Sequence, residues 1–544
     1  MRLIKYNYLS TRSTPAEAAT SKELKLSYKI VFLLTSSEPT EGLQTFLGKR
    51  SILIARTMFD VFSEKSAGCF YHAFRILESM LRLFPADVYD AICGDGRATE
   101  RVGSMLRYLG HVPVCEIIIM LVSMAPITKT SPLYNSASKS RWAFFEILSQ
   151  WIFILKVSEI VVKPQDHCCI DALATAEQHS SAAAHVIQEL IEKLSIEDSG
   201  EILLQPFGFV SSLLYNFIDA AIDKSLQDDI RRSAIKLLCL LVRRAAEPEI
   251  ACISPALGAP PTQTFISNKL FPLRDKITDH IKKRISDIMQ CIMGLNDEEG
   301  NDSKPIKYSS YTIKQPFSVL RSLLIELLVL LVESDDSVAA FIPIELWQNL
   351  MSWCITYAHN NIYHAIFYRL VFAVLRHNQE KPQRLLFEKA MFIDFLIDNF
   401  IPYPDKEEEA RAKDVAIDTL NKHAARGLLM NCANAMRLQA STLPSSTFIK
   451  QFLSSQNRWL EFKPVLIEAT VLQQNFGMGI KIFDMKSSSL GQMVFMGYEP
   501  TIDESGIDHG SRFAKSLGFI DDTDWSDDDM NSDKVETEND VSKD

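Results

Sequence analysis

Residues 315–399 read QPFSVLRSLLIELLVLLVESDDSVAAFIPIELWQNLMSWCITYAHNNIYHAIFYRLVFAVLRHNQEKPQRLLFEKAMFIDFLIDN. Leucines at positions 320, 323, 324, 327, 328 and 331 recur at spacings of three and four, which predicts an amphipathic helix over Arg321–Glu333. Trp347–Tyr357, Ile366–Leu375 and Phe387–Phe400 repeat the pattern. Successive apolar helices with no strand between them predict stacked helical pairs, whose working surface is an extended face rather than a pocket.

The rest of the chain continues this helical pattern. The further predicted helices are Leu24–Leu34, Ile52–Phe62, Cys69–Leu83, Thr99–Leu109, Val114–Ser123, Ser140–Val162, Ile170–Leu194, Phe207–Ile222, Asp228–Arg244, Leu270–Met293, Glu407–Ala440 and Trp459–Gln474. Pro85 and Pro113 stand where helices are expected to begin or end. Three interruptions, at 126–138, 248–264 and 296–311, are predicted loops, and the last of them is predicted to be disordered. Because no fixed period can be written, we expect an all-α fold, an elongated α-solenoid of irregular armadillo- or HEAT-like repeats.

Charge is concentrated at the C-terminal end of the chain. Of 57 basic and 68 acidic residues, the segment Asp521–Asp544 holds 2 and 11, a net charge of −9. The other residues hold 55 basic and 57 acidic side chains, a net charge of −2. Such a body lacks the broad basic field of a nucleic-acid-binding protein. The tail is predicted to be disordered, since so many like charges repel one another and bury little apolar surface.

Cysteine usage and apolar run length indicate a soluble intracellular protein. The 10 cysteines include no Cys-x-x-Cys pair, and Cys239 lies inside an apolar run, as expected of small buried side chains in a reducing compartment. The runs Val112–Val122 and Leu323–Val332 are too short to span a bilayer, and each contains a glutamate. The first residues lack the apolar core of a signal peptide. We therefore expect a cytoplasmic location, with the nucleus as a second compartment, and no membrane insertion.

The search for chemistry finds no convincing site. The segment Gly42–Arg50 has five residues between its glycines and an arginine where a phosphate-binding loop needs a hydroxyl group. Gly477-x-Gly479 follows a helix, so it is a helix end rather than a dinucleotide fingerprint. His167-Cys168-Cys169 lacks a second, suitably spaced pair of zinc ligands. The sequence therefore predicts no catalytic residue, no cofactor and no metal site.

A polar turn at His359–His364 interrupts the apolar helices. In a structural interpretation, Asn360 caps a helix that begins near Ile362, while Tyr363 and the histidines pack between neighbouring helices. In a functional interpretation, the same polar and aromatic edge is exposed and docks a partner. On the second interpretation the partner-binding residues are His359, Asn360, Asn361, Tyr363 and His364.

Residues Gln315–His377 resemble the SAPS family, the regulatory subunits of type-six protein serine/threonine phosphatase. The matching element is Asn360-Asn361-Ile362-Tyr363-His364, followed by Leu370–Leu375. Three other segments are similar to elements of the family in the same order. They are Tyr108-Leu109-Gly110 with Val114–Leu121, Gly427-Leu428-Leu429 with Ala433-Asn434-Ala435 and Trp459-x-x-Phe462, and Phe513-Ala514-x-x-Leu517-Gly518-Phe519 running into Asp521–Trp525. The resemblance covers about Leu24 to Asp529, without the family's Trp-containing start before Leu24.

The resemblance implies a non-catalytic scaffold subunit. Its expected partner is a type-six-like phosphatase catalytic subunit, with further scaffold subunits as additional partners and no nucleic acid. The implied organisation is a disordered segment at 1–21, a SAPS-like helical-repeat domain at 22–476, a linker at 477–510 and an acidic tail at 511–544. In that tail, Phe513, Leu517, Phe519 and Trp525 form an expected linear anchor for a partner. The alternative function is a general α-solenoid adaptor unrelated to phosphatases.

Overall fold

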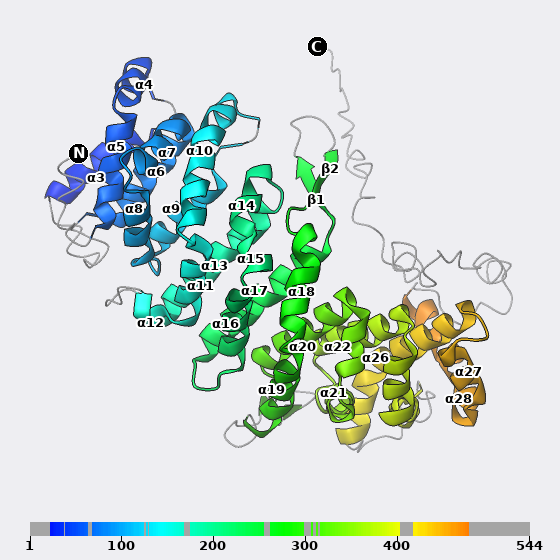
Figure 1. Cartoon of the computed structure of the whole chain (residues 1–544). Helices are drawn as coiled ribbons and strands as arrows, with labels where there is room; N and C mark the ends of the chain where they lie inside the picture. Colours follow the sequence, from blue (N-terminus) through cyan, green and yellow to red (C-terminus); the bar gives the residue numbers. More distant parts are fainter. Residues whose placement is uncertain are drawn as a thin grey trace, which may run out of the picture. The chain divides into compact units, whose positions relative to one another are not determined.

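The computed structural model describes residues 22–477, apart from internal gaps at 37–38, 64–67, 125–126, 129, 168–174, 255–261, 299–305, 308–311, 314–315 and 403–416. Helix is the dominant element of this part of the chain, which confirms the predicted helical class, although four short strands depart from the expected all-α fold (Figure 1). No helix within these residues is long and apolar enough to cross a membrane. The fold divides into two compact units, unit 1 (Met1–Phe341) and unit 2 (Ile342–Asp544). The predicted disordered N-terminal segment, most of the linker and the whole acidic tail lie outside the described residues.

Unit 1 consists almost entirely of helices. Its α-helices are α3 (Lys22–Leu34), α4 (Glu41–Gly48), α5 (Ser51–Phe59), α6 (Phe70–Leu83), α7 (Pro85–Cys93), α8 (Ala98–Leu106), α9 (Val112–Ser123), α10 (Pro132–Gln150), α11 (Phe153–Val162), α12 (Pro164–His167), α13 (Ala176–Leu194), α14 (Glu201–Leu204), α15 (Pro206–Phe209), α16 (Ser211–Ile222), α17 (Asp228–Ala246), α18 (Arg274–Lys282), α19 (Ile285–Glu298) and α20 (Val319–Ser334). Short 3-10 helices are η1 (Asp60–Phe62), η2 (Asp198–Gly200), η3 (Phe271–Leu273) and η4 (Asp336–Phe341). Its strands are β1 (Glu249–Ser254), β2 (Thr262–Ser267), β3 (Ile306–Lys307) and β4 (Thr312–Ile313).

Unit 2 contains fewer and longer helices. They are α21 (Ile344–Thr356), α22 (Asn361–His377), α23 (Glu380–Arg384), the π-helix η5 (Leu385–Lys389), α24 (Phe392–Asn399), α26 (Ile417–Thr442), α27 (Phe448–Ser455) and α28 (Asn457–Gly477). The described residues end with α28 at Gly477, so the helix stop predicted around Gly477 and Gly479 lies at the limit of the described part of the chain.

Local sequence signals explain several helix starts. Pro85 is the first residue of α7 and Pro113 the second of α9, where a missing backbone N–H costs nothing. Thr175 and Gln178 form a reciprocal capping box at the start of α13, although the predicted helix began at Ile170. The charges of α17 complement its helix dipole, with aspartates in its first turn and arginines in its last.

Two predicted loops were partly wrong. In the first, at 126–138, α10 already begins at Pro132 because the Ser131 side chain accepts the Leu133 N–H and caps the helix. In the second, at 248–264, β1 and β2 pair antiparallel from Glu249 opposite Ser267 to Ser254 opposite Thr262. The third predicted loop, 296–311, lies mostly outside the described residues, although α19 continues into it as far as Glu298. Apolar spacing missed the hairpin because each of its strands is only six residues long.

Four predicted helices were wrong because each is divided in the structure. Phe207–Ile222 is divided between α15 and α16, and Leu270–Met293 between α18 and α19, whereas the other two break at a left-handed residue. Ser140–Val162 is divided between α10 and α11 at Ile152, whose φ is +53°. Phe387–Phe400 is divided before α24 at Met391, whose φ is +59°. Both breaks place a side chain in the left-handed region, which a non-glycine residue occupies only where its surroundings hold it there. The apolar spacing continues across both breaks, so the sequence pattern alone does not reveal them.

Helices of unit 1 that are distant in sequence lie side by side and run in the same direction. In the pair of α9 and α13, the N–H of Gly110 donates to His179, and Cys115 contacts the Ala182 carbonyl further along both segments. In the pair of α17 and α20, Cys239 contacts the Leu323 carbonyl, while Arg243 pairs with Glu326 about one turn later (Figure 1). Because α13 also packs against α17, these four helices form one continuous layer within unit 1.

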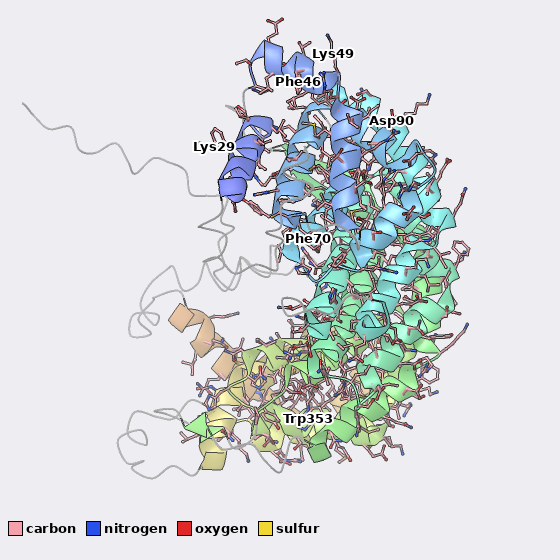
Figure 2. The ribbon with its side chains drawn as sticks, turned by 90° about the vertical axis from the view of Figure 1, so that its left-hand side faces the viewer. Lys29, Phe46, Lys49, Phe70, Asp90 and Trp353 are labelled. Atoms are coloured by element: carbon pink, nitrogen blue, oxygen red, sulfur yellow. The ribbon has the colours of Figure 1, made fainter. Side chains whose placement is uncertain are left out.

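Unit 2 also contains a layer of packed helices. Gln439 on α26 donates to the Leu375 carbonyl at the end of α22, with a distance of 3.2 Å. Five residues earlier on the same helix, Asn434 donates to Thr470 on α28, with a distance of 2.8 Å. Helix α26 therefore lies between α22 and α28. Trp353, labelled in Figure 2, is buried in the core of this unit.

Candidate functional site

The turn that the sequence singled out connects α21 to α22. Asn360 is the N-cap of α22, and its side-chain oxygen accepts the Tyr363 N–H at 3.0 Å. The Asn360 N–H in turn donates to the Tyr357 carbonyl at 2.8 Å, closing the turn before it. This arrangement is the cap expected on the structural interpretation, in which a side chain satisfies an N–H left free in the first turn.

Tyr363 points into unit 2 rather than toward solvent. Its side chain is 0% exposed, and its hydroxyl group donates to the Leu350 carbonyl on α21 at 2.6 Å. Its ring meets Trp353 edge-on at 6.3 Å between centroids and also contacts Phe367 at 6.2 Å. Tyr363 therefore joins α21 to α22 through both apolar packing and a buried hydrogen bond.

His364 makes a second link between the same two helices. It is buried, and its Nε2 lies 3.0 Å from the Cys354 carbonyl oxygen in the last turn of α21. Since a carbonyl only accepts, the imidazole carries its proton on Nε2 and donates it. Burial lowers the pKa of His364, the hydrogen bond to Cys354 opposes that shift, and nearby His359 adds to it.

The exposed part of the turn is small and lies at the head of α22. His359 and Asn361 are exposed, and Ile362 has 71% of its surface in contact with solvent. The sequence interpretation did not include Ile362, although an isoleucine inside a polar turn was the available signal. The five residues proposed for partner binding are therefore divided. His359 and Asn361 are exposed, Asn360 is a half-buried cap, and Tyr363 and His364 belong to the core.

The other residues singled out from the sequence are only partly described. Phe513, Leu517, Phe519 and Trp525 of the expected anchor lie outside the described residues. So do Cys168 and Cys169 of the rejected zinc triplet. In the part of the chain that the structure describes, no three His, Cys, Asp or Glu side chains gather closely enough to hold a metal ion.

The link made by His364 recurs twice in unit 1 with arginine in its place. Arg101 on α8 donates to the Ala91 carbonyl in the last turn of α7, at 3.1 Å. Arg231 on α17 donates to the Ala221 carbonyl near the end of α16, at 3.2 Å. The three helical hairpins are α7–α8, α16–α17 and α21–α22. In each of them the basic residue is the fourth residue of the second helix, and its side chain forms a hydrogen bond with the backbone carbonyl ten positions earlier. A donor at a helix C-terminus satisfies carbonyls that have no partner within the helix and offsets the dipole.

A short repeated pattern in the sequence accompanies this recurring link. In each of these three pairs of consecutive helices, a small residue followed by isoleucine stands near the end of the first helix. The basic residue of the second helix follows ten positions after the small residue: Ala91-Ile92 before Arg101, Ala221-Ile222 before Arg231, and Cys354-Ile355 before His364. Apolar periodicity alone did not reveal this pattern. It shows that the histidine of the Asn-Asn-x-x-His element occupies a position used elsewhere in this chain to join two helices.

A pH dependence of stability follows from the histidine in unit 2. Because burial lowers the pKa of His364 in the folded chain, the unfolded chain binds more protons as the pH falls below about 6.5. Stability is therefore lost as the pH falls from there toward the folded pKa. We expect His364→Gln, whose amide can donate to Cys354, to lose less stability than the wild type between about pH 7 and pH 5. Urea unfolding at several pH values measures this, and identical slopes would contradict it.

Comparison with known proteins finds no matching family model, and no curated protein matches the chain.

Proposed function

We propose that this chain is a non-catalytic scaffold subunit that binds a type-six-like protein serine/threonine phosphatase catalytic subunit and positions it for substrates or further subunits. The observation that carries the proposal is the exposed head of α22. There the Asn360-Asn361-x-x-His364 element, which resembles the SAPS family, leaves His359, Asn361 and Ile362 facing solvent. An exposed apolar side chain beside polar side chains is the composition expected at a docking site.

The proposed fold for this function is an α-solenoid of irregular armadillo- or HEAT-like pairs. The parallel layer within unit 1 supports it, because stacked helical pairs place every second helix side by side in the same direction. The hairpins closed by Arg101, Arg231 and His364 also support it, since one joint recurs in three helical pairs. Such an array offers an extended face for a partner. We place its site of action in the cytoplasm.

A second candidate function is a general α-solenoid adaptor with no phosphatase partner. This alternative is favoured because residues of the Asn360-Asn361-x-x-His364 element stabilise the fold. Asn360 caps α22, while Tyr363 and His364 join α22 to α21, so the fold itself accounts for three of its residues. Co-purification from the native cell with mass spectrometry separates the two functions, because only the first requires a type-six-like catalytic subunit among the recovered proteins.

Substitutions at the head of α22 test the docking role directly. We expect Asn361→Ala combined with Ile362→Asp to weaken phosphatase co-precipitation by about tenfold or more, since the pair removes the central apolar contact. Stability is expected to change by less than about 0.5 kcal/mol, because both side chains are exposed.

The matched control is Leu460→Asp, which introduces the same charge at another exposed apolar position of unit 2. It is expected to leave co-precipitation unchanged. Equal binding by the wild type and the double variant, with the catalytic subunit present, would remove this turn from the interface. Complete absence of a catalytic subunit from the wild-type complex would instead reject the phosphatase function.

A further inference from the structure

Arg437 on α26 forms no ion pair with the described residues of the chain. Its side chain is half-buried, and burial lowers its pKa. Within the described residues of unit 2, Arg384 pairs with Glu380 and Glu388, and Arg458 likewise pairs with two aspartates. Arg437 instead bonds a neutral amide, with its Nε donating to Asn434 Oδ1 at 3.2 Å. A partly desolvated cation without a counter-ion is unfavourable, and an incoming anion would offset that cost.

A chain of hydrogen bonds holds the Arg437 guanidinium in place. Asn434 accepts from Arg437 and donates its Nδ2 to Thr470 Oγ1 at 2.8 Å. Thr470 in turn donates to the Leu466 carbonyl of α28 at 2.7 Å. Only Nε of the guanidinium is used in this way, and its two Nη groups are not among the fully buried atoms. These two groups carry four N–H donors that make no hydrogen bond to the described residues.

Within the described parts of α26 and α28, helical geometry places no acid on the side of Thr470. Asn431, Gln473 and Gln474 are exposed and neutral. Helix α28 has two acidic residues. Glu461 lies nine positions before Thr470, and Glu468 lies two positions before it. At about 100° per residue both therefore lie on the opposite side of the helix from Thr470. The arrangement is a fixed cation with open donors on a neutral polar face.

We propose that Arg437 is a binding site for a carboxylate side chain of an acidic peptide segment, held bidentately by its two Nη groups and oriented through Asn434 and Thr470. A planar guanidinium matches a carboxylate in this geometry. A single arginine on a nearly neutral body does not supply the cluster or the broad field that phosphopeptides and nucleic acids require. This site is independent of the proposed phosphatase function, because it involves neither the α21–α22 turn nor a catalytic subunit.

The probe for this site is a fluorescently labelled peptide with the sequence of Asp521–Asp544, which carries 11 carboxylates. The fluorescence anisotropy of this peptide is measured while the full chain is added. Two forms of the chain are compared, the wild type and a variant in which the acidic residues of the tail are changed to Asn and Gln. We expect Arg437→Gln to weaken binding by about tenfold or more, as for the loss of hydrogen bonds to a charged group. Tighter binding after tail neutralisation identifies the chain's own tail as the natural occupant. Unchanged binding excludes the tail as the occupant of Arg437.

Two further variants separate binding from a structural role. Asn434→Asp supplies an internal counter-ion, so it is expected to raise the melting temperature and to abolish peptide binding. Arg376→Gln, at an exposed arginine of α22, is the control and is expected to change neither property. Equal peptide affinity in the wild type and Arg437→Gln, with either form of the tail, would overturn the proposal. A lower melting temperature with unchanged affinity would assign Arg437 a structural role instead.

Discussion

Replacing Arg141 with alanine is expected to destabilise unit 1 by roughly 3–5 kcal/mol, the largest effect we predict for a polar residue. The Arg141 side chain is 1% exposed and contacts three different parts of the unit. Its Nε donates to the Val122 carbonyl at the end of α9, at 3.1 Å, and its Nη2 contacts the same oxygen. Its Nη1 pairs with Glu197 at 2.6 Å. Its guanidinium carbon lies 4.5 Å from the centre of the Phe145 ring.

The cost arises because the alanine variant leaves two groups without a partner. Glu197 remains a nearly buried carboxylate with no cation, and the last turn of α9 loses the donor that satisfied its carbonyl. Burying an unpaired charge costs far more than the net stabilisation that the pair itself provides. The measurement is urea unfolding, with hydrogen exchange in α9 and α10 to show that unit 1 is the part that opens.

Two further variants test this explanation. Arg75→Ala removes an exposed arginine whose partner, Glu78, is three positions away on the same helix, and it should cost less than about 1 kcal/mol. Combining Arg141→Met with Glu197→Leu removes both charges and should recover much of the lost stability. If the double variant were as unstable as Arg141→Ala, an unpaired Glu197 would not be the cause.

Replacing Tyr363 with alanine is expected to destabilise unit 2 by roughly 3–5 kcal/mol. The ring is fully buried against Trp353 and Phe367, so its removal leaves a cavity between α21 and α22. Tyr363→Phe keeps the ring and removes only the hydrogen bond to the Leu350 carbonyl, and we expect it to cost about 1 kcal/mol. Thermal unfolding, together with hydrogen exchange in α21 and α22, measures both losses.

This prediction also separates the two interpretations of the turn. If Tyr363 acted mainly in docking, its alanine variant would keep its stability and lose partner binding. The buried geometry predicts the reverse at matched concentrations of folded protein, with binding retained and stability lost. A melting temperature equal to that of the wild type would contradict the structural role.

The sequence determined the helical class and most helix positions of this protein. In long segments such as Arg321–Glu333, apolar residues recur at spacings of three and four, which places them on one face only if the segment is a helix. Prolines such as Pro85 mark helix starts, because the first turn does not need their missing N–H. These signals are local, because each depends only on residues that are close together in the sequence. The cap at Asn360 was predicted for the same reason, because it involves residues only three positions apart.

Only the tertiary structure decided which residues of the turn face solvent and where the helices break. Tyr363 and Ile362 are adjacent in sequence, yet one is fully buried against α21 and the other is 71% exposed. The left-handed residues Ile152 and Met391 divide apolar runs whose spacing continues unbroken. Arg141 and Glu197 are 56 positions apart, and the Asn434–Thr470 contact that orients Arg437 spans 36. These features depend on distant helices meeting, and local periodicity carries no information about which helices meet.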